Sequence, residues 1–326
     1  MIVSIIKFIV LSGLITGILA LVLIATNRPV VQEPQDGLDF TSVVGQDLGN
    51  IVAPQDIKMR DGYALPVRSY GDTDPHLPLV IMIHGSGWHG MQFDGLARAL
   101  AEGAHILVPD LRGHGVTPQR RGDVDYIGQF EDDLADVIKA KVMPGQNVVL
   151  LGHSSGGGLV VRFAGGEHGA LMDHALLLAP FLHHNAATMR PNAGGWSHVL
   201  TRRIIGLSML NMARITALNH LPIIQFQMPQ AVLDGPLGHT ATLAYSYRLN
   251  TSYAPRGDYQ GDIASLPNFT LIAGSADEAF IAQEYEPLMT PLTGKGRYLL
   301  IPGVTHLPIV DAPETLKAIQ EDLSGL

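Results

Sequence analysis

Residues 148–158 read V-V-L-L-G-H-S-S-G-G-G and place Gly152, Ser154 and Gly156 in the spacing G-x-S-x-G. The apolar run before this motif predicts a buried strand, and the residues after it predict a helix. A serine at such a sharp turn has strained backbone angles, and small residues two positions away on either side let strand and helix approach. The free N–H groups at the start of the helix can then stabilise a developing oxyanion. The pattern indicates Ser154 as a nucleophile rather than Ser155, which breaks the spacing; a structural Gly-rich turn is the alternative interpretation.

A serine nucleophile needs a base that takes its proton and a carboxylate that holds the base in the right tautomer. Among 14 histidines, His306 ends the stretch Y-L-L-I-P-G-V-T-H, where a Gly- and Pro-containing loop follows the last predicted strand. The order serine, acid, histidine then requires a carboxylate between the two. Asp277 follows the predicted strand F-T-L-I-A-G and is the expected acid, with Glu278 as the second choice. The alternative role of Asp277 is the N-cap of a helix that begins near Ala279.

The stretch His84-Gly85-Ser86-Gly87 follows the apolar run L-V-I-M-I and lies at the edge of the predicted site. We expect the backbone N–H groups of Ser86 and Ser155 to form an oxyanion hole. His84 and Gly85 are expected to support this loop without taking part in the chemistry. An ordinary Gly-rich end of a strand is the alternative.

Apolar strands alternate with helical segments along most of the chain, which is typical of an α/β fold. A tight turn at Asp61-Gly62 predicts an antiparallel hairpin at the start of this fold, near Ile51. The later strands are continuous apolar runs, as expected of parallel strands covered on both faces. These strands are predicted at 78–84, 105–109, 147–153, 175–180, 269–273 and 297–301. The helices are predicted at 93–101, 126–142, 156–164, 279–289 and 313–323.

Residues 182–266 interrupt this alternation with apolar, aromatic and methionine side chains in helical pieces. We interpret this stretch as a lid inserted into the core. The expected organisation is a membrane anchor or signal at 1–26, a linker at 27–50, an α/β core at 51–181, the lid at 182–266 and the rest of the core at 267–326.

The N-terminal segment 8–26 carries no charge and, as a helix, would span roughly 28 Å, close to the thickness of a bilayer core. This length favours an uncleaved single-pass anchor over a cleaved signal peptide, whose apolar stretch is usually shorter. Lys7 and the α-amino group lie before the segment, whereas acidic residues follow it. The positive charge bias therefore places the following domain outside the cytoplasm, in the periplasm of a bacterium. A cleaved segment would instead yield a secreted protein.

The net charge of −9, from 21 basic and 30 acidic residues, argues against nucleic acid as a partner, because polyanion binding needs a basic surface. The absence of cysteine excludes disulfides, thiolate metal sites and a cysteine nucleophile. A metal site at the adjacent His183 and His184 is disfavoured, since no carboxylate-rich motif accompanies them. No metal and no cofactor are expected.

Four motifs carry a resemblance to a known family: H-G-S-G-W-H-G at 84–90, V-P-D-L-R-G-H-G at 108–115, F-E-D-D-L-A-D-V-I at 130–138 and G-H-S-S-G-G at 152–157. Together they resemble the monoacylglycerol lipase and lysophospholipase (serine aminopeptidase-like) branch of the α/β-hydrolases, from residue 51 to the end except the lid. The resemblance implies an α/β-hydrolase fold, with a mostly parallel doubly wound sheet and an inserted helical lid. It also implies a triad of Ser154, Asp277 and His306.

In the same resemblance, Arg112 corresponds to the family's arginine in D-x-R-G-H-G and is expected to be structural, near Asp110 and His114. The sequence departs from the family in two respects. Trp88 stands where the family commonly has a glutamate, and the family usually lacks the N-terminal membrane segment.

These observations predict hydrolysis of a small-molecule or lipid carboxylic ester through an acyl-enzyme. Apolar lid segments such as I-I-G-L-S-M-L-N-M and I-I-Q-F-Q-M suit an acyl chain, although they could equally serve to pack the lid onto the core. A peptidase, an amidase or a haloperoxidase-like enzyme could use the same three residues. A hydrolase-fold binding protein without activity is a further alternative, which the intact set of three residues disfavours.

Overall fold

The computed structural model describes residues 1–30, 37–41 and 49–326 of the chain. Of the predicted linker at 27–50, residues 31–36 and 42–48 therefore lie outside the described residues.

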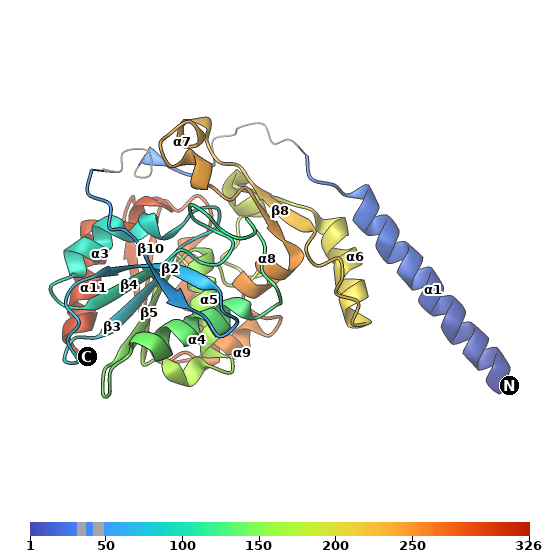
Figure 1. Ribbon diagram of the computed structural model, residues 1–326, viewed down its shortest axis with the longest axis horizontal. Coiled ribbons are helices and arrows are strands. Elements are labelled where there is room, and N and C mark those ends of the chain that lie inside the picture. Colours follow the sequence, from blue (N-terminus) through green and yellow to red (C-terminus); the bar gives the residue numbers. More distant parts are fainter. Residues whose placement is uncertain (31–36, 42–48) are drawn as a thin grey trace.

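An eight-stranded sheet forms the centre of the domain, in the order β1-β2-β4-β3-β5-β6-β10-β11 (Figure 1). Six neighbouring strands of this sheet run parallel, namely β4, β3, β5, β6, β10 and β11. Strand β2 is antiparallel to both β1 and β4. The bounds are β1 Gln55–Lys58, β2 Ala64–Tyr70, β3 Leu79–Ile83, β4 His105–Pro109, β5 Val148–His153, β6 His174–Leu178, β10 Asn268–Gly274 and β11 Gly296–Ile301. The predicted hairpin and all six predicted strands are confirmed, and the backbone groups of these buried runs pair with neighbouring strands.

Helices cover both faces of the sheet, and the sheet divides the core into two apolar layers. Phe130 and Phe163 lie in the layer under α4 and α5, and Leu96 and Ile319 lie in the layer under α3 and α11. The bounds of these helices are α3 Asp94–Leu100, α4 Gln129–Lys141, α5 Ser155–Ala164 and α11 Pro313–Ser324. Short 3-10 turns stand at η1 Gly90–Phe93, η2 Gly169–Leu171 and η6 Pro308–Val310.

Two predicted helices begin later than expected. Helix α4 starts at Gln129 rather than at 126, because Gly128 preceding it adopts a left-handed φ of 101°. The helix predicted at 279–289 is reduced to the 3-10 turn η5 Ala282–Glu284 and α10 Tyr285–Met289. The reason is tertiary: Phe280 forms a β-bridge with Met189, and the Ile281 N–H donates to the Thr188 carbonyl.

The interval between β6 and β10 holds the stretch predicted as a helical lid, and that prediction was only partly right. It contains a three-stranded antiparallel sheet, β7-β8-β9, as well as helices. The segment I-I-Q-F falls in strand β8 rather than in a helix, because its backbone pairs with β7 and β9. The elements are η3 Pro191–Gly195, β7 Ser197–Val199, α6 Thr201–Met212, β8 Pro222–Phe226, α7 Gln230–Leu233, η4 Gly238–Thr240, β9 Ala244–Ser246, α8 Tyr247–Tyr253 and α9 Tyr259–Ala264.

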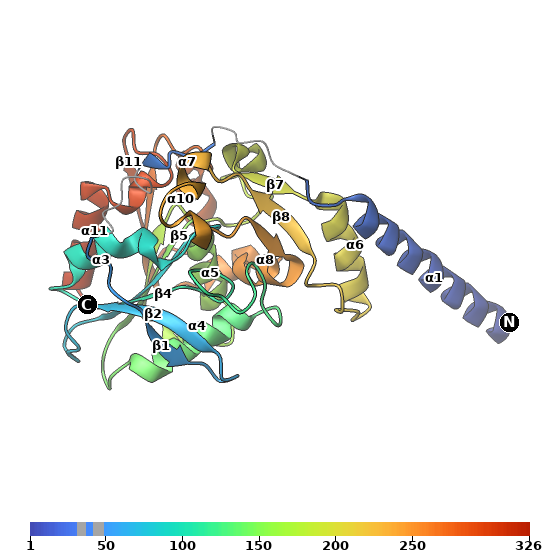
Figure 2. The same cartoon turned by 45° about the horizontal axis from the view of Figure 1, so that its top comes forward.

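The N-terminal helix α1, Ile2–Thr26, projects from the domain and contacts it at α6 (Figures 1 and 2). With a mean hydropathy of 2.8, it is long and apolar enough to cross a membrane. Ala20 and Ile24 are the buried residues of α1 and pack in one cluster with Leu207. Gly206 permits this approach, since a Cβ atom there would lie 2.5 Å from the carbonyl oxygen of Ala20.

Candidate active site

Ser154 lies at the sharp turn between β5 and α5, with a φ of 55° and a ψ of −120°. This region of backbone angles is strained for a residue other than glycine, and such strain gathers at functional sites. A Cβ at position 152 would lie 2.3 Å from the Gly156 carbonyl oxygen, and one at position 156 would lie 2.1 Å from that of Ile83. Both glycines are therefore required by the close approach of strand and helix.

The structure brings Ser154, His306 and Asp277 together from the carboxyl ends of β5, β11 and β10. Nε2 of His306 lies 3.0 Å from Oγ of Ser154, so that the serine hydroxyl can donate its hydrogen to the ring. Nδ1 of His306 lies 2.8 Å from Oδ2 of Asp277, which fixes the tautomer with the proton on Nδ1. The His306 and Asp277 side chains are 2% and 0% exposed, so water does not compete for this bond.

The two oxygens of Asp277 have separate partners. Oδ2 faces His306, whereas Oδ1 accepts hydrogen bonds of 2.8 Å from the N–H groups of Ala279 and Phe280. Asp277 thus holds the backbone turn that follows it as well as the histidine, but it is not a helix N-cap, because the next helical turn begins at Ala282 with Ile281 as its N-cap. Burial raises the pKa of Asp277, but His306 and these backbone hydrogen bonds lower it by a larger amount. The pKa of Asp277 therefore lies below its ordinary value of 3.8. The carboxylate is therefore ionised at neutral pH.

Glu278, the second choice for the acid, does not contact the imidazole of His306. Its Oε2 accepts a hydrogen bond of 2.7 Å from the backbone N–H of His306 instead. Of the two adjacent carboxylates, Asp277 binds the ring of His306 and Glu278 binds its main chain.

The loop after β3 lies against the start of α5. The hydroxyls of Ser86 and Ser155 are 2.5 Å apart, and Ser155 is the first residue of α5, where N–H groups have no partner within the helix. The Gly87 N–H donates to the hydroxyl of Tyr245 in β9 over 2.7 Å, which ties this loop to the insertion. His84 is fully buried and its Nε2 accepts the Leu111 N–H at 3.2 Å, in keeping with a supporting position.

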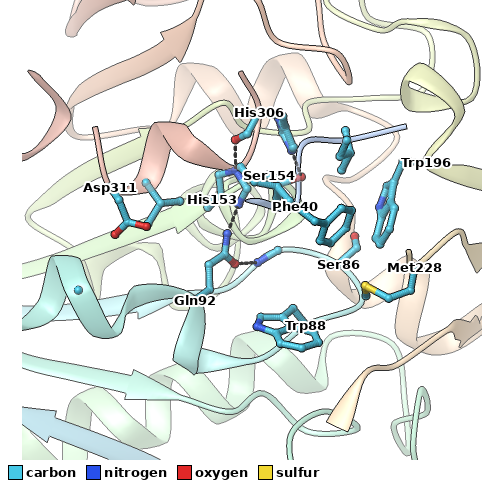
Figure 3. A pocket seen from close by; sticks show the side chains of 15 residues that line it. Phe40, Ser86, Trp88, Gln92, His153, Ser154, Trp196, Met228, His306 and Asp311 are labelled. Carbon is cyan, nitrogen blue, oxygen red and sulfur yellow. Dashed lines mark hydrogen bonds between the residues drawn. The ribbon is translucent and has the colours of Figure 1, made fainter. Parts of the chain in front are cut away.

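A hydrogen-bonded relay, which the sequence did not indicate, joins this loop to His306 (Figure 3). The Gly85 N–H donates to Oε1 of Gln92 at 3.0 Å, and Nε2 of Gln92 donates to Nδ1 of His153 at 2.6 Å. Nε2 of His153 then donates to the carbonyl oxygen of His306 at 2.9 Å. Burial lowers the pKa of His153 to about 3, so the ring stays neutral and keeps the tautomer that this relay needs. The only available signal was the position of His153 inside the motif.

Arg112 is buried and lies near His114, whose Nδ1 is 3.1 Å from the Arg112 carbonyl oxygen, but its guanidinium pairs with carboxylates other than Asp110. It forms ion pairs of 2.7 Å with the buried Asp133 and 2.9 Å with Asp61. Asp110 is instead paired with the buried Arg68 at 2.7 Å. Alternation of side chains along β2 places Arg68 toward Asp110, a contact between strands that the motif itself does not encode.

The pocket in front of Ser154 has a volume of about 230 Å³ and mostly apolar walls. Trp88, Trp196 and Met228 face it, and Phe40 lies beside Trp196 (Figure 3). Trp88, one of the two departures from the family that the sequence resembles, is buried and stacks on His89 with ring centroids 4.8 Å apart. Among residues 1–30, 37–41 and 49–326, no group of three or more His, Asp or Glu side chains is arranged to hold a metal ion.

Comparison with known proteins places the chain among hydrolases. The profile of the Alpha/beta hydrolase family matches residues 80–319. Monoglyceride lipase of Homo sapiens is 29% identical over 179 residues, which are 53% of this chain and 54% of the lipase. Monoacylglycerol lipase of Mycolicibacterium smegmatis is 31% identical over 107 residues, 31% of this chain and 38% of that lipase. The matches span about a third to a half of the length of the curated relatives.

Solved structures share the fold at low identity. Monoacylglycerol lipase of Paleococcus ferrophilus superposes with a TM-score of 0.58 at 19% identity, covering 80% of this chain and 98% of that one. A bacterial membrane phospholipase A gives 0.58 at 17% identity and covers 99% of this chain and 97% of its own. Because the family profile spans most of the sequence, the chain belongs to the alpha/beta hydrolase family and is similar to its monoacylglycerol lipases.

Proposed function

We propose that this protein is a serine hydrolase that cleaves carboxylic esters of an apolar or lipid-like acyl group. The observation that carries the proposal is the hydrogen-bonded series of Ser154, His306 and Asp277, with distances of 3.0 and 2.8 Å, beside a largely apolar pocket. Such a series can activate a serine hydroxyl, which is otherwise a poor nucleophile.

In the proposed reaction, Oγ of Ser154 attacks the ester carbonyl carbon while its proton passes to Nε2 of His306. The negative charge that develops on the carbonyl oxygen is stabilised by the backbone N–H groups of Ser86 and Ser155. His306 then donates the proton to the leaving alcohol, and the acyl group remains on Ser154. A water molecule, deprotonated by His306, releases the carboxylic acid and restores the serine. Asp277 stays ionised and stabilises the protonated ring.

The pocket supports an apolar substrate group. Its walls include Leu38, Phe40, Trp88, Trp196 and Met228, and burial of each methylene group against such walls contributes about 0.8 kcal/mol. Monoglyceride lipase is the name of a relative that aligns with half of the chain, so monoacylglycerols belong among the substrates to be tested.

We also propose that α1 remains attached as a membrane anchor, with the domain on the extracytoplasmic side. In support, the folded domain has a docking site for α1, where Gly206 contacts the backbone of Ala20 and Ile24 is buried. Removal of α1 would expose the apolar residues of α6 that it covers. A tag at the N-terminus should stay with the domain and with membranes through an alkaline carbonate wash. Recovery of a soluble protein without the tag would contradict the anchor.

Labelling with a fluorophosphonate tests the hydrolase proposal directly. The full-length protein in detergent should be labelled, and Ser154→Ala should abolish labelling and ester hydrolysis. Ser155→Ala is the matched control, because it keeps the backbone N–H and should still be labelled. Undiminished labelling of Ser154→Ala would refute the assignment. A panel of p-nitrophenyl esters, p-nitroanilides and monoacylglycerols then separates an esterase from an amidase.

A further inference from the structure

A short stretch between α1 and the sheet, residues 37–41, lies against the pocket although it is far in sequence from the other site residues. Leu38 and Phe40 both line the pocket, and Phe40 is only 9% exposed. The ring of Phe40 lies 5.4 Å from that of Trp196, and Figure 3 shows the two side by side. Gly37 packs on the backbone of Trp196, since a Cβ there would lie 3.4 Å from its nitrogen. The stretch thus contributes apolar surface where a substrate would bind.

The same stretch is connected to His306 through the carboxylate of Glu278. The backbone N–H of Asp39 donates to Oε1 of Glu278 at 2.9 Å, and the other oxygen of Glu278 accepts the N–H of His306 at 2.7 Å. The hydroxyl of Thr305 lies 3.5 Å from Oδ2 of Asp39. A carboxylate can accept both N–H groups at once, whereas a neutral amide has one acceptor oxygen. The carboxylate of Glu278 therefore fixes the position of the pocket wall relative to the loop that carries His306.

The chain that leads from α1 toward this stretch is also attached to the domain. Val30 donates its N–H to Oε1 of Gln225 at 2.9 Å and accepts a bond from Nε2 of the same side chain at 2.7 Å. The side chain of Asn27 accepts the Arg202 N–H at 3.0 Å. These contacts hold residues 27 and 30 on α6 and β8.

We propose that residues 37–41 form a specificity-determining wall of the acyl pocket, in which Phe40 and Leu38 contact the acyl chain and Glu278 is the positioning residue that joins this wall to His306. The inference rests on the proposed hydrolase function. It assigns part of the substrate site to the segment that connects the domain with α1.

Alkyl fluorophosphonates of two lengths, methyl and octyl, test the proposal in the full-length protein in detergent. The readout is the ratio of the labelling rate constants, octyl over methyl. Each methylene group that contacts the wall can raise the rate up to about fourfold. Phe40→Ala should therefore lower the ratio at least tenfold. Phe40→Trp, which adds volume to the same wall, should also lower it, by excluding the octyl chain. Ile51→Ala is the control, because Ile51 is 40% exposed and does not line the pocket; its ratio should equal that of the wild type.

Glu278→Gln tests the connection to His306. It should slow labelling by both probes about tenfold or more, because the amide has one acceptor oxygen for the two N–H groups and no longer holds His306 and the wall together. If both Phe40 variants slow the two probes equally, the ratio is unchanged and the segment has only a structural role. An unchanged ratio would therefore overturn the proposal that residues 37–41 form a wall of the acyl pocket. If Glu278→Gln leaves both labelling rates unchanged, Glu278 does not position His306. No labelling of the wild type would instead refute the hydrolase proposal and, with it, the inference.

Discussion

The Nε2 atom of His153 donates a hydrogen bond of 2.9 Å to the main-chain carbonyl oxygen of His306, and the two rings lie 4.7 Å apart. One histidine inside the nucleophile motif thus holds the loop that carries another. On its other side His153 accepts a bond from Gln92, whose oxygen binds the Gly85 N–H. The elements that surround Ser154 are therefore positioned by one neutral, buried ring.

His153→Phe should lower kcat/KM for esters by about 10- to 100-fold, because a phenyl ring fills the space but leaves the His306 carbonyl and the Gln92 amide without this partner. The measurement is ester hydrolysis together with the rate of fluorophosphonate labelling. His174→Phe is the control, since His174 is also buried but lies at the amino-terminal end of β6, whereas Ser154 follows the carboxyl end of the neighbouring parallel strand β5. Wild-type activity in His153→Phe would show that the relay does not position His306.

Gly156→Ala should strongly destabilise the protein. The added methyl group would lie 2.1 Å from the Ile83 carbonyl oxygen and 2.6 Å from that of His84, both main-chain atoms that cannot move independently. We expect a loss of about 3 kcal/mol or more in the free energy of unfolding, measured by urea denaturation in detergent. Gly257→Ala has nothing within 4 Å of the new atom and should change stability little. A Gly156→Ala protein as stable as Gly257→Ala would contradict the close approach of β3 and α5.

Arg112→Met should destabilise the protein by about 3–5 kcal/mol, because it leaves the buried carboxylate of Asp133 without its cation. The two side chains are 5% and 3% exposed and 2.7 Å apart. Burial already raises the pKa of Asp133 above 3.8 even with Arg112 beside it.

Arg297→Met is the matched control for Arg112→Met. Arg297 is 44% exposed and pairs with Glu321 and Asp322 at the surface, where an ion pair contributes about 0–1 kcal/mol. Chemical denaturation of both variants gives the comparison. Similar losses from the two substitutions would mean that burial of the Arg112 pair does not matter.

Stability should fall as the pH is lowered from 7 to 5. Burial lowers the pKa of His84 to about 4 and the pKa values of His89 and His153 to about 3. In the unfolded chain a histidine has a pKa of about 6.5, so between about pH 6.5 and pH 4 the unfolded state binds more protons than the folded state. Each of these histidines therefore decreases the free energy of unfolding by up to about 1.4 kcal/mol per pH unit in this window.

Urea denaturation at several pH values measures the number of protons taken up on unfolding. His89→Gln should reduce that number by about one at pH 5, since a glutamine does not titrate. Stability that is constant from pH 7 to pH 5 would show that these rings are not held neutral.

The sequence by itself determined the sheet, because continuous apolar runs such as β3 and β5 must be buried on both faces and paired with neighbouring strands. It also indicated the turn at Ser154, since only glycine fits at positions 152 and 156 when strand and helix meet. These features depend on local residue types and on their spacing, which one sequence contains.

Only the tertiary structure decided which groups meet across the fold. Asp277 and Glu278 are adjacent carboxylates, and the loop geometry alone directs one to the ring of His306 and the other to its backbone. Four further features join residues whose partners no local pattern specifies. They are the relay through His153, the pairing of Arg68 with Asp110, the small sheet around β8 and the contact of Phe40 with Trp196. Such contacts depend on how distant segments pack together, because hydrogen bonds and apolar contacts act between neighbours in space and leave no spacing rule in the chain.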